Sequence, residues 1–512
     1  MRFETIIGLE IHVQLKTKSK MFCGCSNESD DYAPNTAICP VCMGHPGTLP
    51  TMNRQAIDYA LRLARALNFT ISTNSKFDRK HYFYPDLPKG YQISQYDEPL
   101  ASDGHIVLLT KGSRKRIRFE RLHLEEDAAK LVHIPGRETS LVDFNRAGTP
   151  LVEMVTKPDI ETPEEARAFL QELRLIVRLL NISYGDMEKG HLRCDANISL
   201  RPTQETLHEL RENKQFTLED RELWPKTEIK NMNSFRSVEQ ALVYEVKRQT
   251  ELWKKGTPPM EQSTRGWNDS EKQTVLQRTK ETSEDYRYLP EPDLSRVIVA
   301  EEWIKEIEAE MPELPQMRRD RFDEQYHLDP AVRDILIEQH HAGDFFEEVA
   351  SEIKAWIDAE PAQQKINKDA ADELLRTASA WLVTKLFEIL SKENLSLQDM
   401  RLTAENFAEL LLMFYKKIVN SSSAMKVLEA MVMTGEDPSN LVEKMGLTQV
   451  EDDDAIVSSA EEVLREHADI VAQYHSGKSS VIQFFVGQVM KKTKGRANPQ
   501  KAKSVLEVLL RK

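Results

Sequence analysis

Four cysteines near the N-terminus have the spacing of a metal site. Cys23 and Cys25 form one close pair, and Cys39 and Cys42 form a second pair after a short loop. Two such pairs supply four thiolates to a tetrahedral Zn²⁺ ion without long-range assembly. A disulfide framework is the weaker interpretation, because thiols stay reduced in the cytoplasm. We therefore predict a structural zinc element at 23–42, with no ligand position left open for catalysis.

Polar side chains line one face of several expected strands. In residues 8–15, Glu10, His12 and Gln14 alternate with apolar residues, and this period of two places them on one side of a strand. Three further segments show polar faces: Arg193, Asp195 and Asn197 in 192–200, Glu228 and Lys230 in 226–230, and His123 and Glu125 in 116–126. The pattern thus predicts a sheet with a polar face that is able to contact a ligand.

The residue types on that face suit magnesium and phosphate. The carboxylates of Glu10, Glu125 and Asp195 are able to hold Mg²⁺ directly or through water. Arg193 and Lys230 are able to bind phosphate oxygens. An ordinary solvated face is the alternative, because antiparallel sheets often expose one side to water.

A loop at 82–92 packs aromatic residues, prolines and a glycine around a single lysine, Lys89. Its composition fits a rigid surface loop. It equally fits the wall of a pocket in which Lys89 faces a ligand.

The chain lacks the common nucleotide-binding loops. Gly477-Lys478-Ser479 is not the end of a P-loop, because Ala472 stands where the upstream glycine is required. Any ATP chemistry would therefore need a metal site on the sheet.

Charge is unevenly distributed along the chain. The formal net charge of −14 argues against nucleic-acid binding by the chain as a whole. Between 477 and 512, however, nine Lys and Arg residues are accompanied by a single acid, Glu507. Such a basic end predicts a phosphate-binding surface, with a solvated tail as the alternative.

The elements that must position these residues change in type along the chain. Residues 1–295 alternate strand patterns with helices, one of which begins at a capping box at Thr162. We predict an α+β domain there, with a largely antiparallel sheet and helices on its apolar side. Helical spacing dominates the remainder, which we divide into a helical domain at 296–448 and a basic helical tail domain at 449–512.

Length and composition exclude several classes of protein. At 512 residues the chain is long enough for about three domains. No apolar run approaches the roughly 18 residues of a transmembrane helix. The N-terminus shows neither a signal peptide nor a transit peptide. We therefore expect a cytoplasmic protein without a membrane partner.

Long ordered motifs connect these features to a known family. They are GLEIHVQL at 8–15, PNT at 34–36, CPVC at 39–42, YPDLPKGYQISQ at 84–95, HLEED at 123–127, DFNRAG at 143–148, LRCDAN at 192–197, EIKN at 228–231, NSF at 233–235, TRGW at 264–267, DYRYLPEPD at 285–293, VGQVM at 486–490 and GRANP at 495–499. Along nearly its whole length the chain resembles the family of B subunits of the bacterial aspartyl/glutamyl-tRNA(Asn/Gln) amidotransferases.

The resemblance implies a catalytic component of a three-subunit complex, whose other members are an amidase (the A subunit) and a small accessory protein (the C subunit). Such complexes act on misacylated tRNA, either Glu-tRNA(Gln) or Asp-tRNA(Asn). The B subunit phosphorylates the side-chain carboxylate with ATP, and ammonia from glutamine displaces the phosphate to leave an amide. The resemblance thus implies a carbon–nitrogen ligase with a cradle-like sheet domain, which requires ATP, Mg²⁺ and structural Zn²⁺.

The resemblance also implies roles for individual residues. Those with catalytic roles are Glu10, His12, Glu125, Asp195 and Lys89, of which Glu10, His12 and Glu125 would bind Mg²⁺. Those that would bind ATP or phosphate are Arg193, Lys230 and Asn197. Those that would contact tRNA are Lys491, Lys492, Lys494 and Arg496.

Two other functions stay open at this point. An adaptor would bind tRNA and use zinc only for structure, whereas a stand-alone ligase would form the amide without an amidase partner. The joint presence of Glu10, His12, Glu125 and Asp195 favours the enzyme, since an adaptor needs none of them. The charged segment 202–225 looks like an insertion, which we expect to loop outward.

Overall fold

The computed structural model describes most of the chain. It covers residues 1–28, 31–110, 113–134, 136–212, 223–280, 286–359, 367–447, 453–475, 481–493, 497 and 499–511. The chain separates into two compact units, Met1–Pro315 and Gln316–Lys512. The finer division at 295 and 448 stays a prediction. Across the described ranges, no helix is both long and apolar enough to cross a membrane.

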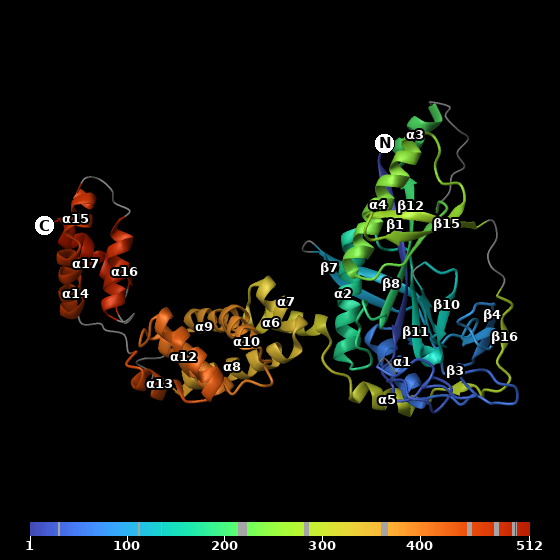
Figure 1. The fold of residues 1–512 in the computed structure, drawn as a ribbon, viewed down its shortest axis with the longest axis horizontal. Helices are drawn as coiled ribbons and strands as arrows, with labels where there is room; N and C mark the ends of the chain where they lie inside the picture. Colours follow the sequence, from blue (N-terminus) through green and yellow to red (C-terminus); the bar gives the residue numbers. More distant parts are fainter. Residues whose placement is uncertain are drawn as a thin grey trace. The chain divides into compact units, whose positions relative to one another are not determined.

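A large mixed sheet forms the centre of the first unit (Figure 1). In the described residues its strands run in the order β15 (Gln273–Lys280), β14 (Gln262–Asn268), β13 (Thr227–Lys230), β12 (Leu192–Pro202), β1 (Phe3–Gln14), β11 (Pro150–Thr156), β8 (Ser113–Glu126), β6 (Ala101–Ser102) and β2 (Thr70–Ile71), with β7 (His105–Thr110) paired to β8. Strands β13 and β14 pair in parallel, and the other neighbours pair antiparallel. The predicted α+β domain with a largely antiparallel sheet is confirmed.

Alternation along β1 creates two different faces of the sheet. Leu9 and Ile11 are buried in the hydrophobic core of the unit, whereas Glu10 and His12 point to the opposite side. This is the period of two that the sequence predicts, because successive side chains of a strand point in opposite directions.

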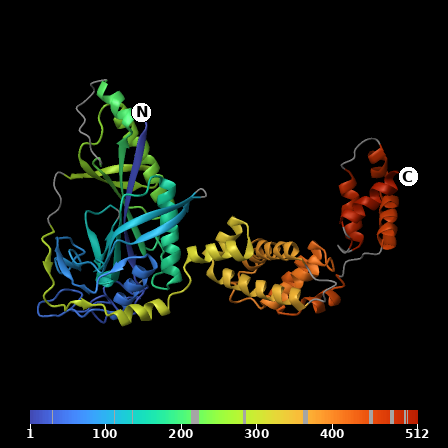
Figure 2. The same ribbon diagram turned by 180° about the vertical axis from the view of Figure 1, so that it is seen from behind.

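Among the described helices, α1 (Arg54–Ala66), α2 (Pro163–Leu179) and α4 (Phe235–Lys254) contribute most of the helical side chains of this core. Figures 1 and 2 show α2 and α4 along the same side of the sheet. The side chain of Asn53 caps α1, and that of Thr162 caps α2, as the sequence motifs predict. The helices therefore cover one face and leave the polar face for a ligand.

Shorter elements adjoin the sheet in the described part of this unit. They are β4 (Asp78–His81), β5 (Tyr91–Ser94) and β16 (Leu289–Pro290) in one small sheet, β3 (Asn74–Ser75) with β17 (Val297–Ile298), β9 (Lys130–His133) with β10 (Ser140–Asp143), η1 (Phe144–Arg146), α3 (Gln204–Glu212) and α5 (Glu301–Ala309). The backbone N–H of Ile93 in β5 donates to Glu126 Oε1 at 3.0 Å, which fixes this small sheet beside the end of β8.

The expectation that segment 202–225 loops outward is wrong for its described part. Helix α3 forms there, and Leu210 is buried in a small apolar cluster with Trp224 and Trp253. The physical reason is the apolar spacing within the helix, where Leu207 and Leu210 lie three residues apart and both are buried. Residues 213–222 lie outside the described residues.

The second unit is helical wherever it is described. Its helices are α6 (Pro315–Tyr326), α7 (Pro330–Glu338), α8 (His340–Ala359), α9 (Lys368–Trp381), the π-helix η2 (Leu382–Leu386), α10 (Phe387–Lys392), α11 (Ala404–Tyr415), α12 (Ser421–Thr434), α13 (Pro438–Lys444), α14 (Asp453–Glu466), α15 (Ala468–His475), α16 (Ile482–Lys492) and α17 (Pro499–Arg511). Helices α14, α16 and α17 share a core that includes Ile456, Phe485 and Leu506.

Candidate active site and metal centres

Strand register brings polar side chains into one row across the sheet. Arg193 of β12 lies opposite His12 of β1. His12 in turn lies opposite Glu153 of β11, and Glu153 lies opposite His123 of β8. Directly opposed residues of antiparallel strands are close enough for their side chains to interact. The row unites predicted residues from separate segments and adds Glu153 to them.

Short contacts connect this row to Glu125. His12 Nε2 lies 3.3 Å from Glu125 Oε1 and 3.3 Å from Glu153 Oε2. His123 Nε2 lies 3.4 Å from Glu153 Oε2 and 3.9 Å from Glu125 Oε2. His123, Glu125 and Glu153 are buried, and His12 is half-buried. We call the five residues Glu10, His12, His123, Glu125 and Glu153 the sheet-face cluster.

Carboxylates hold both rings of the sheet-face cluster in the protonated form. Burial lowers the pKa of His12, but hydrogen bonds to Glu125 and Glu153 outweigh it and raise that pKa well above its usual value. Burial also lowers the pKa of His123, but the charge of Glu153 is the largest of the effects that outweigh it. The pKa of His123 therefore rises to about 9. Burial would raise the carboxyl pKa values, but the rings reverse this effect. The pKa of Glu125 falls to about 2, and the pKa of Glu153 falls well below its usual value.

Glu10 differs from the other acids of the sheet-face cluster. Burial, and then the charge of Glu153, raise the pKa of Glu10. A carboxylate whose charge is disfavoured in this way gains from a bound divalent cation. The rise therefore marks Glu10 as a candidate metal ligand.

The spacing of ligand atoms fits a divalent cation. The atoms of Glu10, His12 and Glu153 all lie within 4.8 Å of one another, and so do those of His123, Glu125 and Glu153. Ligands of Mg²⁺ or Ca²⁺, at roughly 2.0–2.6 Å from the ion, lie at most about 4 to 5 Å from each other, so each group is close to the spacing of a divalent-cation site. Binding at the first group would displace a proton from the His12 ring, because a ligating nitrogen has to be unprotonated.

The two predicted phosphate-binding cations flank the sheet-face cluster and are paired with acids. Arg193 Nη2 donates to Asp127 Oδ2 at 2.8 Å. Lys230 Nζ forms an ion pair with Asp195, which lies opposite Glu10 in the sheet. These pairs keep both cations oriented beside the sheet-face cluster.

A cavity of about 840 Å³ continues the polar face past Glu10. Gly8 and Asn197, which are opposed across β1 and β12, line it together with apolar side chains such as Ile6 and Trp224. Asn197 Oδ1 is buried and has no hydrogen-bond partner among the described residues. A buried amide oxygen of this kind costs free energy until a donor reaches it. The cavity is therefore suited to an organic ligand with polar groups.

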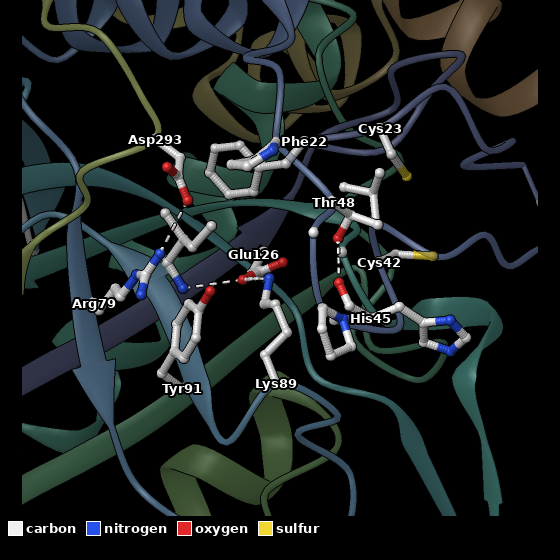
Figure 3. Close-up of a pocket in the computed structure, with 17 residues that line it drawn as sticks. Phe22, Cys23, Cys42, His45, Thr48, Arg79, Lys89, Tyr91, Glu126 and Asp293 are labelled. Carbon is white, nitrogen blue, oxygen red and sulfur yellow. Dashed lines mark hydrogen bonds and ion pairs between the residues drawn. The ribbon is translucent and has the colours of Figure 1, made fainter.

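Lys89 lies in a different cavity, of about 210 Å³, beside the cysteines (Figure 3). Its Nζ forms an ion pair with Glu126 and lies 5.7 Å from the centre of the Tyr91 ring. Glu126 follows Glu125 in β8, so the two side chains point to opposite faces of the strand. The structure therefore does not bring Lys89 together with Glu10 and His12. The catalytic role of Lys89 stays a prediction.

The four cysteine sulfur atoms converge. The Sγ atoms of Cys23, Cys25, Cys39 and Cys42 all lie within 4.8 Å of one another, and those of Cys39 and Cys42 are 3.9 Å apart. Sulfur atoms bonded to one tetrahedral Zn²⁺ at about 2.3 Å lie about 3.8 Å apart. This donor set, called the cysteine cluster below, therefore fits zinc.

The pKa values of three thiols of the cysteine cluster shift in different directions. A hydrogen bond from Cys23 is the main reason that the pKa of Cys42 falls to about 5, and attraction to Lys20 adds to it. The same hydrogen bond raises the pKa of Cys23, and burial raises the pKa of Cys25 to about 11. A lowered pKa favours the thiolate, which is the form of cysteine that binds a metal ion.

The predicted tRNA-binding residues are described only in part. Lys491 and Lys492 are exposed in the last turn of α16. Lys492 Nζ forms ion pairs with two glutamates of α14, at 2.7 and 2.9 Å. Lys494 and Arg496 lie outside the described residues. Contact with tRNA stays a prediction.

Sequence reasoning missed Glu153 and Lys80. Glu153 is the lone charged residue of β11, and a single acid in an apolar strand signals a paired, functional group. Burial lowers the pKa of Lys80, but the charge of Glu125 and its neighbours outweighs this and raises it. Because Lys80 comes from the small sheet, no local pattern could have pointed to it.

Known proteins are similar to this chain along its whole length. Residues 5–305 match the GatB/GatE catalytic domain, and residues 363–510 match the GatB domain. The chain is 44% identical to the B subunit of the aspartyl/glutamyl-tRNA(Asn/Gln) amidotransferase of Thermomicrobium roseum over 512 residues, which cover 100% of this chain and 99% of that protein. Proteins of the same name are 42% identical in Thermotoga maritima, over 100% of this chain and 99% of the relative, and in Brevibacillus brevis, over 99% of each.

These relatives belong to a carbon–nitrogen ligase complex that uses glutamine as the amide donor. As its motifs predict, the chain belongs to the family of B subunits of the aspartyl/glutamyl-tRNA(Asn/Gln) amidotransferases.

Proposed function

We propose that the chain converts the side-chain carboxylate of Glu-tRNA(Gln), of Asp-tRNA(Asn), or of both, into an amide. ATP supplies the activating phosphoryl group. A partner amidase supplies ammonia from glutamine, and a small third protein completes the complex. The products are Gln-tRNA(Gln) and Asn-tRNA(Asn).

The reaction needs activation because a carboxylate is a poor electrophile toward ammonia. A side-chain carboxylate oxygen attacks the γ-phosphorus of ATP, and the bond from that phosphorus to ADP breaks. Ammonia then attacks the acyl carbon, the bond to phosphate breaks, and the nitrogen loses a proton. The site must therefore hold ATP, offset phosphoryl charge and exclude water.

The sheet-face cluster supports the metal-dependent part of this chemistry. Glu10, His12 and Glu153 would hold Mg²⁺, with Glu125 as a further ligand through water or as the group that orients His12. A bound Mg²⁺ would offset the negative charge of the phosphates during transfer. The contacts of His12 with both glutamates, each 3.3 Å long, fix its ring before any ligand arrives.

The flanking cations and the large cavity support nucleotide binding. Arg193 and Lys230 exchange Asp127 and Asp195 for phosphate oxygens, which accept charge-assisted hydrogen bonds equally well. The cavity of about 840 Å³ has room for the nucleoside, whose donors reach the buried oxygen of Asn197.

The remaining sites serve structure and tRNA recognition. The cysteine cluster holds structural zinc, because all four ligand positions are filled by sulfur. The basic segment 477–512 contacts tRNA phosphates, which attract Lys and Arg without regard to sequence.

The convergence of Glu10, His12 and Glu153 carries the proposal, since a passive adaptor does not need two carboxylates and an imidazole gathered on the polar face of its sheet. The test combines the full chain and its two partner proteins with Mg²⁺, ATP, glutamine and either misacylated tRNA. ADP release and amidation of the esterified amino acid are expected, and both should require Mg²⁺.

The matched variants are Glu10→Ala and Glu4→Gln. Glu10→Ala should abolish ADP release and amidation. Glu4→Gln removes an exposed carboxylate of the same strand, paired with Arg201 at 2.7 Å, and should leave both unchanged. Binding of tRNA without ADP release would contradict the proposal and favour an adaptor. Amidation with glutamine in the absence of the amidase would indicate a stand-alone ligase.

A further inference from the structure

Lys20 is buried beside the cysteine cluster without an acidic partner. Its side chain is 0% exposed, and its Nζ donates to the carbonyl oxygen of Phe144 at 3.4 Å and lies 3.9 Å from Cys42 Sγ. In the part of the chain that the structure describes, no Asp or Glu forms an ion pair with Lys20. A buried ammonium group is costly unless an anion lies next to it. Among the described residues, the group closest to Lys20 Nζ that is able to carry negative charge is therefore the sulfur of Cys42.

The backbone holds Lys20 in this position. Its N–H donates to the carbonyl oxygen of Cys25 at 3.0 Å, and the N–H of Met21 donates to that of Gly148 at 2.8 Å. A Cβ on Gly148 would lie 3.4 Å from Lys20 Cδ and 3.6 Å from Cys42 Cβ. Gly148 thus packs against both side chains, so the lysine stem is confined alongside Cys42.

Four thiolates around one Zn²⁺ carry a double negative charge, which is itself costly to bury. We propose that the Lys20 ammonium is the internal counter-charge of the zinc–thiolate centre, and that it increases zinc retention by hydrogen bonding to Cys42 Sγ. The inference rests on the proposed zinc centre. It makes Lys20 a positioning residue rather than a ligand, in the way that groups bonded to ligands tune other metal sites.

Two substitutions separate charge from packing. Lys20→Met keeps a flexible, unbranched side chain of similar length but removes the charge. Lys20→Arg keeps the charge but introduces a larger planar group. A counter-charge role predicts that arginine is the better replacement, and a packing role predicts that methionine is.

The experiment measures zinc retention of the full chain by competition with a chelator at fixed pH. Co²⁺ substitution reports in parallel whether four sulfur atoms still bind the metal. We expect Lys20→Met to bind zinc about 10- to 100-fold more weakly, and Lys20→Arg to recover part of the loss. Lys18→Met removes an exposed lysine two positions earlier and should bind zinc like the unchanged chain.

The outcomes distinguish this inference from the zinc proposal on which it rests. Lys20→Met could unfold and be refolded by excess zinc, while Lys20→Arg stays folded. This result would also support the role of Lys20 as a counter-charge. Unchanged zinc retention in Lys20→Met, with weaker retention in Lys20→Arg, would overturn it in favour of packing. An unchanged chain that binds no zinc and gives no four-sulfur Co²⁺ spectrum would overturn the zinc centre itself, and the role of Lys20 with it.

Discussion

The sheet-face cluster and the cysteine cluster are both compact sets of side chains that are able to bind a metal ion, but they are assembled differently. The cysteine cluster takes every ligand from 23–42. The sheet-face cluster takes its ligands from β1, β8 and β11, which are far apart in sequence and meet through strand register. The first is a property of one segment, and the second is a property of the whole sheet.

This difference predicts how each site should respond to a mutation. A register slip of one residue would turn the ligands of a strand to the opposite face, so the sheet-face cluster depends on every strand between its members. Loss of one thiolate, in contrast, should release zinc without moving the strands. The following variants test whether the two sites are separable in this way.

The largest effect is expected from Glu153→Gln. The amide loses the charge that holds both His12 and His123, at 3.3 and 3.4 Å. We expect kcat/KM for amidation to fall about 100-fold or more, with zinc content unchanged. Steady-state kinetics with misacylated tRNA, together with metal analysis, measure both. Activity within about threefold of the unchanged chain would remove Glu153 from the site.

Cys39→Ser should have the next largest effect, and a different one. Zinc affinity should fall by more than the about 10- to 100-fold expected for loss of a group that only supports a ligand, because the serine oxygen is a poorer ligand for zinc than a thiolate. The unfolding temperature of the first unit should fall as well, while ADP release at low temperature is largely kept. Metal analysis and calorimetry test this. Complete loss of ADP release by a variant whose sheet stays folded would contradict the separation of the two sites, since the two clusters would then act as one.

Two lysine variants compare the cavities beside the two clusters. Lys230 is paired with Asp195 beside the sheet-face cluster, whereas Lys89 is paired with Glu126 beside the cysteine cluster. Lys230→Met should raise the KM for ATP about tenfold, because one phosphate contact is lost. Lys89→Met should leave that KM within about twofold. Equal increases in the two variants would place Lys89 in the nucleotide site after all.

The smallest effect is expected in the tail, which belongs to neither cluster. Lys491→Ala should weaken tRNA binding about two- to threefold. It should also reduce by about one the number of ions released when tRNA binds, which the salt dependence of the affinity measures. Lys492→Ala should have less effect, since two glutamates already pair with Lys492 at 2.7 and 2.9 Å. Binding titrations at several salt concentrations measure both. A larger loss for Lys492→Ala would mean that tRNA displaces those glutamates.

The same contrast explains which parts of the site the sequence predicts. Spacing alone predicts the cysteine cluster, because its ligands are close neighbours in sequence. Period-two alternation predicts the polar faces that carry Glu10, His12 and Glu125, because a strand alternates whatever its neighbours are. Local capping chemistry predicts the helix start at Thr162.

Only the tertiary structure decides which polar faces meet. Glu153 joins His12 because β11 pairs with β1, and Asp127 holds Arg193 beside the sheet-face cluster. Lys89 comes from a conspicuous motif, but the fold places it in the cavity beside the cysteines. Strand order and register depend on contacts between distant segments, and no local pattern carries that information. The sequence by itself therefore determined the family, the cysteine cluster and the faces of the strands, whereas packing of the whole sheet decided which side chains meet in the sheet-face cluster.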